Sequence, residues 1–254
     1  MTQSERISAL AAEIRKYCQA HADPSQANRY ARYFKEGYDG WGLLGRKEHP
    51  LWNEQQREWL TTHRSLKLAG FLKLGELLFT GGKFEEGSLA IRFLKEFRGE
   101  LDAEALKDVA RWFGSGISNW AHTDVLCAEV IGPLLELGQV RLEDLAPWRE
   151  SRHSYQRRAV PVAMLGLLKH AKDVKPLLEF LRPMMMDDER VVQQGLGWFL
   201  REAWKTAPTP VEAFLMQWKD RAPRVIFQYA TEKMEAKARH RFRRSSAAVA
   251  HRAA

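Results

Sequence analysis

Residues 84–97 read FEEGSLAIRFLKEF, a stretch in which apolar side chains recur at the three- and four-residue spacing of an amphipathic helix. An offset of 36 residues aligns this stretch with later ones that begin at Trp120, Gln156 and Val192. Under that offset, one column holds only small residues: Gly87, Thr123, Ala159 and Gly195. A second column is apolar: Ile91, Cys127, Ala163 and Phe199. Small residues let helices approach closely, and the period is near that of HEAT-type helix pairs, so the sequence predicts stacked helical repeats.

The rest of the chain is also predicted to be helical, because helical periodicity continues and no alternating strand pattern occurs. The predicted helices cover residues 3–20, 25–36, 52–62, 64–80, 84–97, 102–113, 120–137, 142–149, 154–170, 174–182, 188–205, 209–220 and 223–238. No Gly/Ser- or Pro-rich linker divides the chain, so we expect one domain over residues 1–236 and a basic, disordered tail over residues 237–254. The predicted fold class is all-α, an α-solenoid of HEAT-like repeats, curved, with a concave face.

The composition favours a soluble protein of a reducing cytoplasm. Of the residues, 45% are apolar, which is enough for a large core, and no apolar run is long enough to span a membrane. Cys18 and Cys127 are far apart in sequence and form no Cys-x-x-Cys motif, which argues against disulfides and cysteine-bound zinc. The net charge is +8, but six basic residues and no acidic ones lie in the tail. The tail either attracts phosphate groups or is only a solubilising end.

Motifs for other chemistries are absent or lack their structural context. Residues 40–45 read GWGLLG and match G-x-G-x-x-G, but a predicted helix precedes them where a dinucleotide site needs a strand. A flexible loop is the better interpretation. The eight histidines form no H-E-x-x-H motif, and no G-x-S-x-G elbow occurs. We therefore expect neither a cofactor nor a metal.

The informative cluster is Trp120-Ala121-His122-Thr123-Asp124, in which Trp120 and Asp124 share one helix face a turn apart. Corresponding segments one and two repeats later hold Arg157, Arg158, Trp198 and Arg201. If the 36-residue register holds, two indoles, one carboxylate and two guanidiniums converge on adjacent helices. Taken one at a time, each residue also fits a structural role, a Trp in core packing and an Asp at a helix start.

The chain resembles the HEAT-like repeat alkylpurine DNA glycosylases, the bacterial DNA alkylation repair family. The resemblance extends from about Ile7 to Tyr229 and rests on the order and spacing of four motifs. These are Ala31-Arg32-Tyr33-Phe34-Lys35, Trp120-x-x-x-Asp124, Gln156-Arg157-Arg158-Ala159 and Gly197-Trp198-x-Leu200-Arg201-Glu202.

The resemblance implies a role for each matching residue. Asp124 is expected to be the catalytic carboxylate, with Trp120 and Trp198 flanking it as an aromatic cradle. The resemblance places Tyr33 at the lesion as well. It also implies that Arg158 and Arg201 hold backbone phosphates, with Arg157 as the alternative to Arg158.

The implied activity is release of 3-methyladenine and 7-methylguanine from duplex DNA, by a monomer at the bacterial nucleoid and without base flipping. Two alternatives stay open. Asn119 and Ala121 stand where the family often has a second Trp and an acidic residue, which leaves room for a non-catalytic paralogue that binds damaged or branched DNA. The third possibility is a protein–protein scaffold, since α-solenoids commonly bind peptides.

Overall fold

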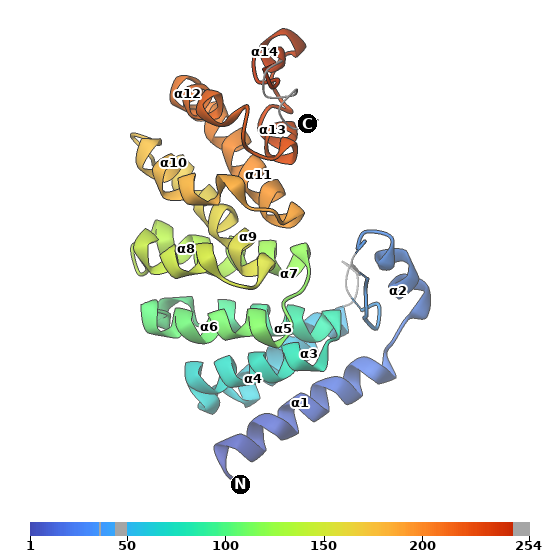
Figure 1. Cartoon of the computed structure of the whole chain (residues 1–254). Coiled ribbons are helices and arrows are strands. Elements are labelled where there is room, and N and C mark those ends of the chain that lie inside the picture. The colour runs from blue at the N-terminus through green and yellow to red at the C-terminus, as the bar shows by residue number, and fades with distance from the viewer. Residues whose placement is uncertain (36, 44–49, 246–254) are drawn as a thin grey trace. The chain divides into compact units, whose positions relative to one another are not determined.

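The structure, a computed structural model, describes residues 1–35, 37–43 and 50–245, and every regular element within these ranges is a helix (Figure 1). The predicted all-α fold of helical repeats is therefore confirmed. Contacts divide the chain into two compact units, Met1–Val130 and Ile131–Ala254. A single domain over residues 1–236 and a concave face both stay predictions.

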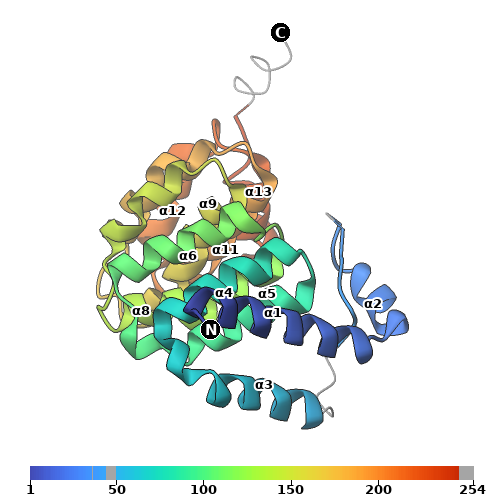
Figure 2. The ribbon, with the colours of Figure 1, turned by 90° about the horizontal axis from the view of Figure 1, so that it is seen from below.

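Unit 1 is built around α4, which packs against α1, α5 and α6 (Figure 2). Its helices are α1 (Gln3–Ala20), α2 (Pro24–Ala31), α3 (Pro50–Thr62), α4 (Lys67–Gly81), α5 (Phe84–Lys95), α6 (Ala103–Ser115) and α7 (Trp120–Leu126), with 3-10 turns η1 (Arg64–Leu66) and η2 (Arg98–Glu100). Leu74 and Leu78 of α4 have no exposed surface. The indole of Trp112 on α6 donates to the carbonyl of Leu72, 3.1 Å away, so its one polar atom is satisfied within the core.

Several elements differ from the sequence-based helices. The helix expected over 142–149 is a 3-10 helix, the one expected over 154–170 becomes 3-10 after Ala163, and the one expected over 223–238 is interrupted after Ala230. The helix expected over 25–36 ends at Ala31, because the chain then turns so that Phe34 stacks on Trp120 and contacts Phe84 edge-on. The helix expected over 120–137 contains a π-helical turn, η3 (Cys127–Ile131), between α7 and α8 (Gly132–Glu136). Pro133 follows that turn, and it has no backbone N–H to continue a regular hydrogen-bond ladder.

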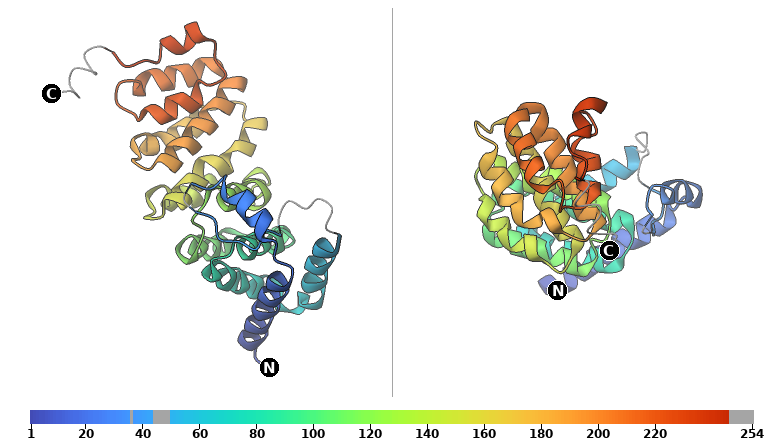
Figure 3. Two further views of the ribbon diagram at one scale, coloured as in Figure 1. Left: turned by 90° about the vertical axis from the view of Figure 1, so that its right-hand side faces the viewer. Right: turned by 45° about the horizontal axis from the view of Figure 1, so that its top comes forward.

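Unit 2 is built around α11, which packs against both α9 and α13. Figure 3 shows its C-terminal helices, orange to red, stacked one beside the next. After α8 the elements are η4 (Leu142–Glu150), α9 (Ser154–Ala163), η5 (Met164–Lys169), α10 (Lys175–Leu181), η6 (Arg182–Met186), α11 (Arg190–Thr206), α12 (Pro208–Trp218), α13 (Arg224–Ala230) and α14 (Ala236–His240). Val192, Leu196 and Phe199 line the buried face of α11 at helical spacing and have no exposed surface.

The column of small residues marks places where helices meet closely. A Cβ added to Gly87 would lie only 2.7 Å from the ring of His122, and one added to Gly195 would lie 3.3 Å from a side chain of α9. Thr123 and Ala159, the other members, have no exposed surface. Each unit therefore uses these positions as the sequence comparison suggested.

The first half of the expected tail is packed against unit 2. Residues 236–240 form α14, and Phe242 is buried. The guanidinium of Arg224 donates to the carbonyl of Phe242, and the backbone N–H of Ser245 donates to Asp220. Residues 246–254, the remainder of the expected tail, lie outside the described residues.

Two further observations bear on the composition. Within the described ranges, no helix is both long and apolar enough to cross a bilayer. Cys18 and Cys127 are both buried, and neither is part of a disulfide.

Candidate nucleic-acid interface

The start of α7 is fixed by Asn119, whose side-chain oxygen accepts a hydrogen bond from the backbone N–H of His122 at 2.8 Å. Its amide nitrogen lies 2.9 Å from His122 Nδ1. Asn119 therefore caps the helix and orients the His122 ring. The residue that departs from the family pattern has a clear structural role here.

His122 anchors α7 to α5. Its Nε2 lies 2.9 Å from the carbonyl oxygen of Phe84, and the two rings stack with centroids 4.3 Å apart. A carbonyl only accepts and the amide of Asn119 only donates toward the ring, so His122 is neutral and carries its proton on Nε2. Burial lowers the pKa of His122 to about 4, which agrees with that assignment. Sequence reasoning missed this residue, because its partners are distant along the chain.

Trp120 begins α7 and is 40% exposed, so it is not a core residue. Its indole stacks on Phe34, with ring centroids 5.6 Å apart and planes 18° from parallel. Phe34 in turn contacts Phe84 edge-on. The indole is thus supported by unit 1 while much of its surface faces solvent.

Asp124 follows on the same helix, one turn after Trp120, and is half-buried. Tyr33 precedes Phe34, the residue on which Trp120 stacks, and is 65% exposed. Trp120, Asp124 and Tyr33, all singled out by sequence, are therefore exposed or partly exposed on unit 1. The spacing of four along a helix gives Trp120 and Asp124 a common face.

The backbone N–H groups of the glycine-rich loop bind a side chain of the protein itself, not the phosphate that the motif suggests. The buried carboxylate of Glu85 accepts hydrogen bonds from the backbone N–H groups of Trp41 (2.9 Å), Gly42 (2.7 Å) and Leu43 (3.0 Å). It also accepts one from the hydroxyl of Tyr38. The N–H groups that would cradle a phosphate are thus bound by the protein's own carboxylate, which argues against a dinucleotide site and fixes Trp41, Gly42 and Leu43 of the predicted loop in place. Leu44 and Gly45 of the motif lie outside the described residues.

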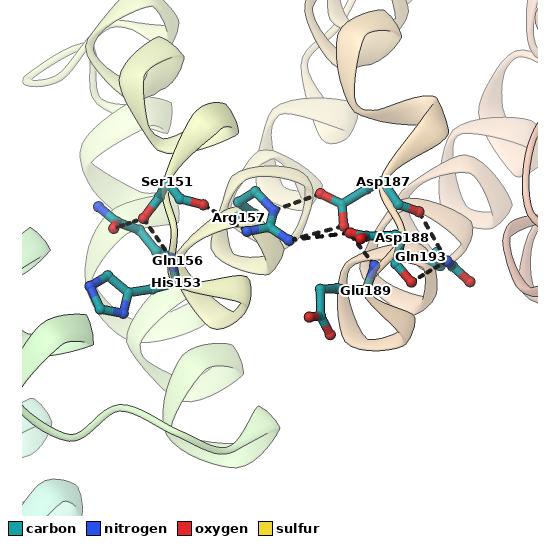
Figure 4. A network of polar contacts seen from close by, with 8 residues as sticks. All are labelled: Ser151, His153, Gln156, Arg157, Asp187, Asp188, Glu189 and Gln193. Atoms are coloured by element: carbon teal, nitrogen blue, oxygen red, sulfur yellow. Dashed lines mark hydrogen bonds and ion pairs between the residues drawn. The ribbon is translucent and has the colours of Figure 1, made fainter.

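In unit 2, Arg157 is bound within the protein (Figure 4). Its Nε and Nη2 donate to the two carboxylate oxygens of Asp187 at 2.6 and 3.2 Å, and Nη1 donates to the carbonyl of Ser151. The hydrogen bonds to Asp187 raise the pKa of Arg157. Its side chain is 13% exposed. This geometry is that of a bidentate structural ion pair.

Arg158 is more deeply placed, at 6% exposure, and its Nη1 donates to the carbonyl of Val191 near the start of α11. Arg201 on α11 is 19% exposed and binds Glu202 at 3.0 Å and Glu232 at 2.5 Å. Trp198, three residues before Arg201, is half-buried. Trp120 and Asp124 belong to unit 1, whereas Arg158, Trp198 and Arg201 belong to unit 2. Their convergence on one site stays a prediction.

The fold and these side chains define an all-α helical-repeat protein with a supported, exposed indole and a nearby carboxylate on one helix. The family model described as DNA alkylation repair enzyme matches residues 14–234. The chain belongs to that family, which places it in the repair of alkylated DNA with DNA as its partner.

A solved structure supports the fold. It is described as "Predicted DNA alkylation repair enzyme from Enterococcus faecalis", and it is similar with a TM-score of 0.69 and 16% identity, over 85% of this chain and 97% of that one. No curated protein matches the chain.

Proposed function

We propose that the protein is a DNA glycosylase that hydrolyses the N-glycosidic bond of positively charged N3- and N7-alkylated purines in duplex DNA. The observation that carries the proposal is Trp120, 40% exposed and held by its stack on Phe34, with Asp124 one turn later on α7. Membership of the DNA alkylation repair enzyme family supports the substrate class.

The chemistry suits a site without a strong general acid. Alkylation at N3 or N7 gives the purine a positive charge, so the base leaves as a neutral molecule when the C1′–N bond breaks. Positive charge then develops on the sugar, where the carboxylate of Asp124 stabilises it and orients the attacking water. Water adds its oxygen to C1′ and loses a proton, which gives an abasic site and a free base.

The aromatic residues add to this stabilisation. An indole face attracts a cation by roughly 0.5–2 kcal/mol, and each 1.4 kcal/mol is about tenfold in rate. In the proposed mechanism Trp120 and Trp198 provide such faces, and Tyr33 contacts the DNA beside the lesion. The predicted substrates are 3-methyladenine and 7-methylguanine. The proposed protein acts as a monomer at the nucleoid, since one copy is enough to process one lesion.

The phosphate contacts are assigned to Arg158 and Arg201, with Arg157 as the alternative to Arg158. Of the three, Arg201 is the easiest to engage, because its partner Glu232 is half-exposed and solvated. A DNA phosphate would compete with a solvated carboxylate at lower cost than with the buried Asp187.

The proposed route involves no base flipping, but one cavity favours a pocket-based alternative. It measures about 630 Å³, lies beside the start of α7, and has Tyr38, Phe84 and His122 in its walls. A glycosylase that relied on such a pocket would select bases by shape and accept neutral lesions. A route that relies on charge lability would release methylated purines and leave neutral hypoxanthine in place.

The test is a base-release assay on methylated duplex DNA under single-turnover conditions, with wild type beside Asp124→Asn. We expect wild type to release both methylpurines, and Asp124→Asn to bind DNA normally yet lose most release. Equal rates for the two proteins would refute the catalytic role of Asp124. DNA binding by wild type without any release would support the non-catalytic alternative instead.

A further inference from the structure

Unit 2 also holds a cavity that the proposed reaction does not use. A cavity of about 430 Å³ opens between α13 and α14, and the residues around it include Arg224, Arg239, His240 and Arg243. Phe227 forms part of its wall, and no Asp or Glu is among the residues that line it. The cavity is therefore a concentration of positive charge without a matching carboxylate.

Arg224 is held in place at this cavity. Its Nη1 donates to the carbonyl of Phe242 at 2.8 Å, and its guanidinium carbon lies 4.7 Å above the ring of Phe227. One hydrogen bond and one ring face thus fix the plane of the guanidinium and leave further N–H donors. A planar guanidinium with fixed orientation is suited to bidentate binding of a phosphate.

The neighbouring Arg244 adds to the charge. Its Nη2 donates to the carbonyl of Ala222, while its Nε is buried and has no hydrogen-bond partner among the described residues. No ion pair joins Arg224, Arg239, Arg243 or Arg244 to a carboxylate within the described ranges. By contrast, Arg241 on the same segment binds Glu212 at 3.1 Å.

This arrangement has an electrostatic cost that an anion would offset. Burial lowers the pKa of Arg224, and the charges of Arg244 and Arg243 lower it further. Like charges held together in a partly desolvated place repel one another. A bound anion offsets that repulsion because it attracts each of the positive side chains. The charge of Arg244 contributes to lowering the pKa of the neighbouring Asp220, but no Asp or Glu is among the described residues that line the cavity itself.

We propose that this cavity binds a phosphate group of the DNA backbone. The contact is independent of sequence and of damage, because phosphates carry no base information. It holds the duplex through residues that take no part in the glycosidic reaction. The inference rests on the proposed function only in that both take DNA as the ligand.

The test measures binding of undamaged duplex DNA over a range of salt concentrations. In Arg224→Gln, we expect the slope of log Kd against log salt to fall by about one and the affinity to drop several-fold. The double variant Arg239→Gln/Arg243→Gln changes two exposed side chains, so it tests the same cavity if Arg224→Gln does not fold. Arg241→Gln is the matched control, because it removes one nearby charge that already has a carboxylate partner, and we expect the wild-type slope.

The outcomes separate the two proposals. A wild-type slope in both cavity variants would overturn the phosphate contact whatever the base-release assay shows. Absence of base release by wild type would defeat the glycosylase proposal and leave the slope result standing. Titration with inorganic phosphate, followed through the arginine Nε–H signals, tests for a free-anion site. Phosphate binding that depends on Arg224, together with an unchanged DNA slope, would also overturn the DNA assignment.

Discussion

His122 donates from Nε2 to the backbone carbonyl of Phe84 at 2.9 Å, and the same two residues stack ring on ring. This pair joins the helix that carries Trp120 and Asp124 to α5. The interaction needs the neutral ring. Nδ1 accepts a hydrogen bond from the amide of Asn119, so it cannot carry a proton of its own while that bond is present.

The first prediction is a pH-dependent loss of stability caused by His122. Burial lowers its folded-state pKa to about 4, from an ordinary value of 6.5. The unfolded chain therefore takes up a proton that the folded protein does not, so the contribution is complete above pH 6.5 and is lost as pH falls toward 4. The loss amounts to about 3 kcal/mol at the lower end.

Urea unfolding at several pH values between 7 and 4 checks this. The variant His122→Gln should be less stable at pH 7 and should show a flatter pH dependence than wild type over this window. His170→Gln, which changes an exposed histidine, should follow the wild-type curve. A pH dependence in His122→Gln as steep as in wild type would contradict the assignment.

The second prediction concerns the exposed indole. Trp120→Ala should slow base release by about 2- to 30-fold, the range that a cation–π interaction of 0.5–2 kcal/mol gives. Trp198→Ala should act in the same direction. Val125→Ala is the control on α7, because Val125 is exposed and off the face that Trp120 and Asp124 share. Single-turnover rates on methylated duplex measure the effect, and unchanged rates in both Trp variants would return these residues to a packing role.

The repeat pattern of the sequence was informative because it recorded contacts between neighbouring helices. Gly87 and Gly195 were recognisable as small residues at a fixed period. A Cβ at Gly87 would collide with the ring of His122 at 2.7 Å, and a Cβ at Gly195 would make a tight contact of 3.3 Å with the side chain of Arg158. The exposure of Trp120 was not encoded in that way. It depends on Phe34, from a separate segment, standing beneath the indole.

The polar contacts between distant segments were not predictable from local pattern. Glu85 occupies a helical register position like any other acidic residue in a first turn, yet it binds a loop more than forty residues earlier. Arg157 and Arg158 were likewise indistinguishable by sequence except for the alanine that follows. The structure separates them, since one is paired with Asp187 and the other is buried against the carbonyl of Val191.

The third prediction follows from the loop that Glu85 holds. In Glu85→Gln, the single carbonyl oxygen can still accept from Gly42 and Leu43, but an amide NH₂ would face the N–H of Trp41. An orphaned buried donor costs roughly 1–3 kcal/mol, so we expect a loss of that size in the free energy of unfolding.

Hydrogen exchange locates the effect. The amides of Trp41, Gly42 and Leu43 should exchange faster in Glu85→Gln than in wild type. Tyr38→Phe is the matched control, because it removes only the longest of the four hydrogen bonds, at 3.3 Å, and should leave these amides protected. Undiminished protection in Glu85→Gln would show that other contacts hold the loop.

The last prediction separates the arginines by what each one binds. Arg157→Gln leaves the buried carboxylate of Asp187 without its bidentate partner, so we expect a loss of about 3 kcal/mol in stability. The salt dependence of DNA binding by the Arg157→Gln variant should match that of the wild type. Arg201→Gln removes a more exposed guanidinium whose partner Glu232 stays solvated, so stability should change by less than about 1 kcal/mol.

For Arg201→Gln we expect the change in DNA binding instead, with the slope of log Kd against log salt lower by about one. Urea unfolding and fluorescence anisotropy on the same protein samples measure the two quantities. The opposite pattern, a stable Arg157→Gln with a reduced slope and an Arg201→Gln with the wild-type slope, would mean that Arg157 leaves Asp187 to bind a phosphate. The ion pair in Figure 4 would then be the DNA-free state of a contact that DNA replaces.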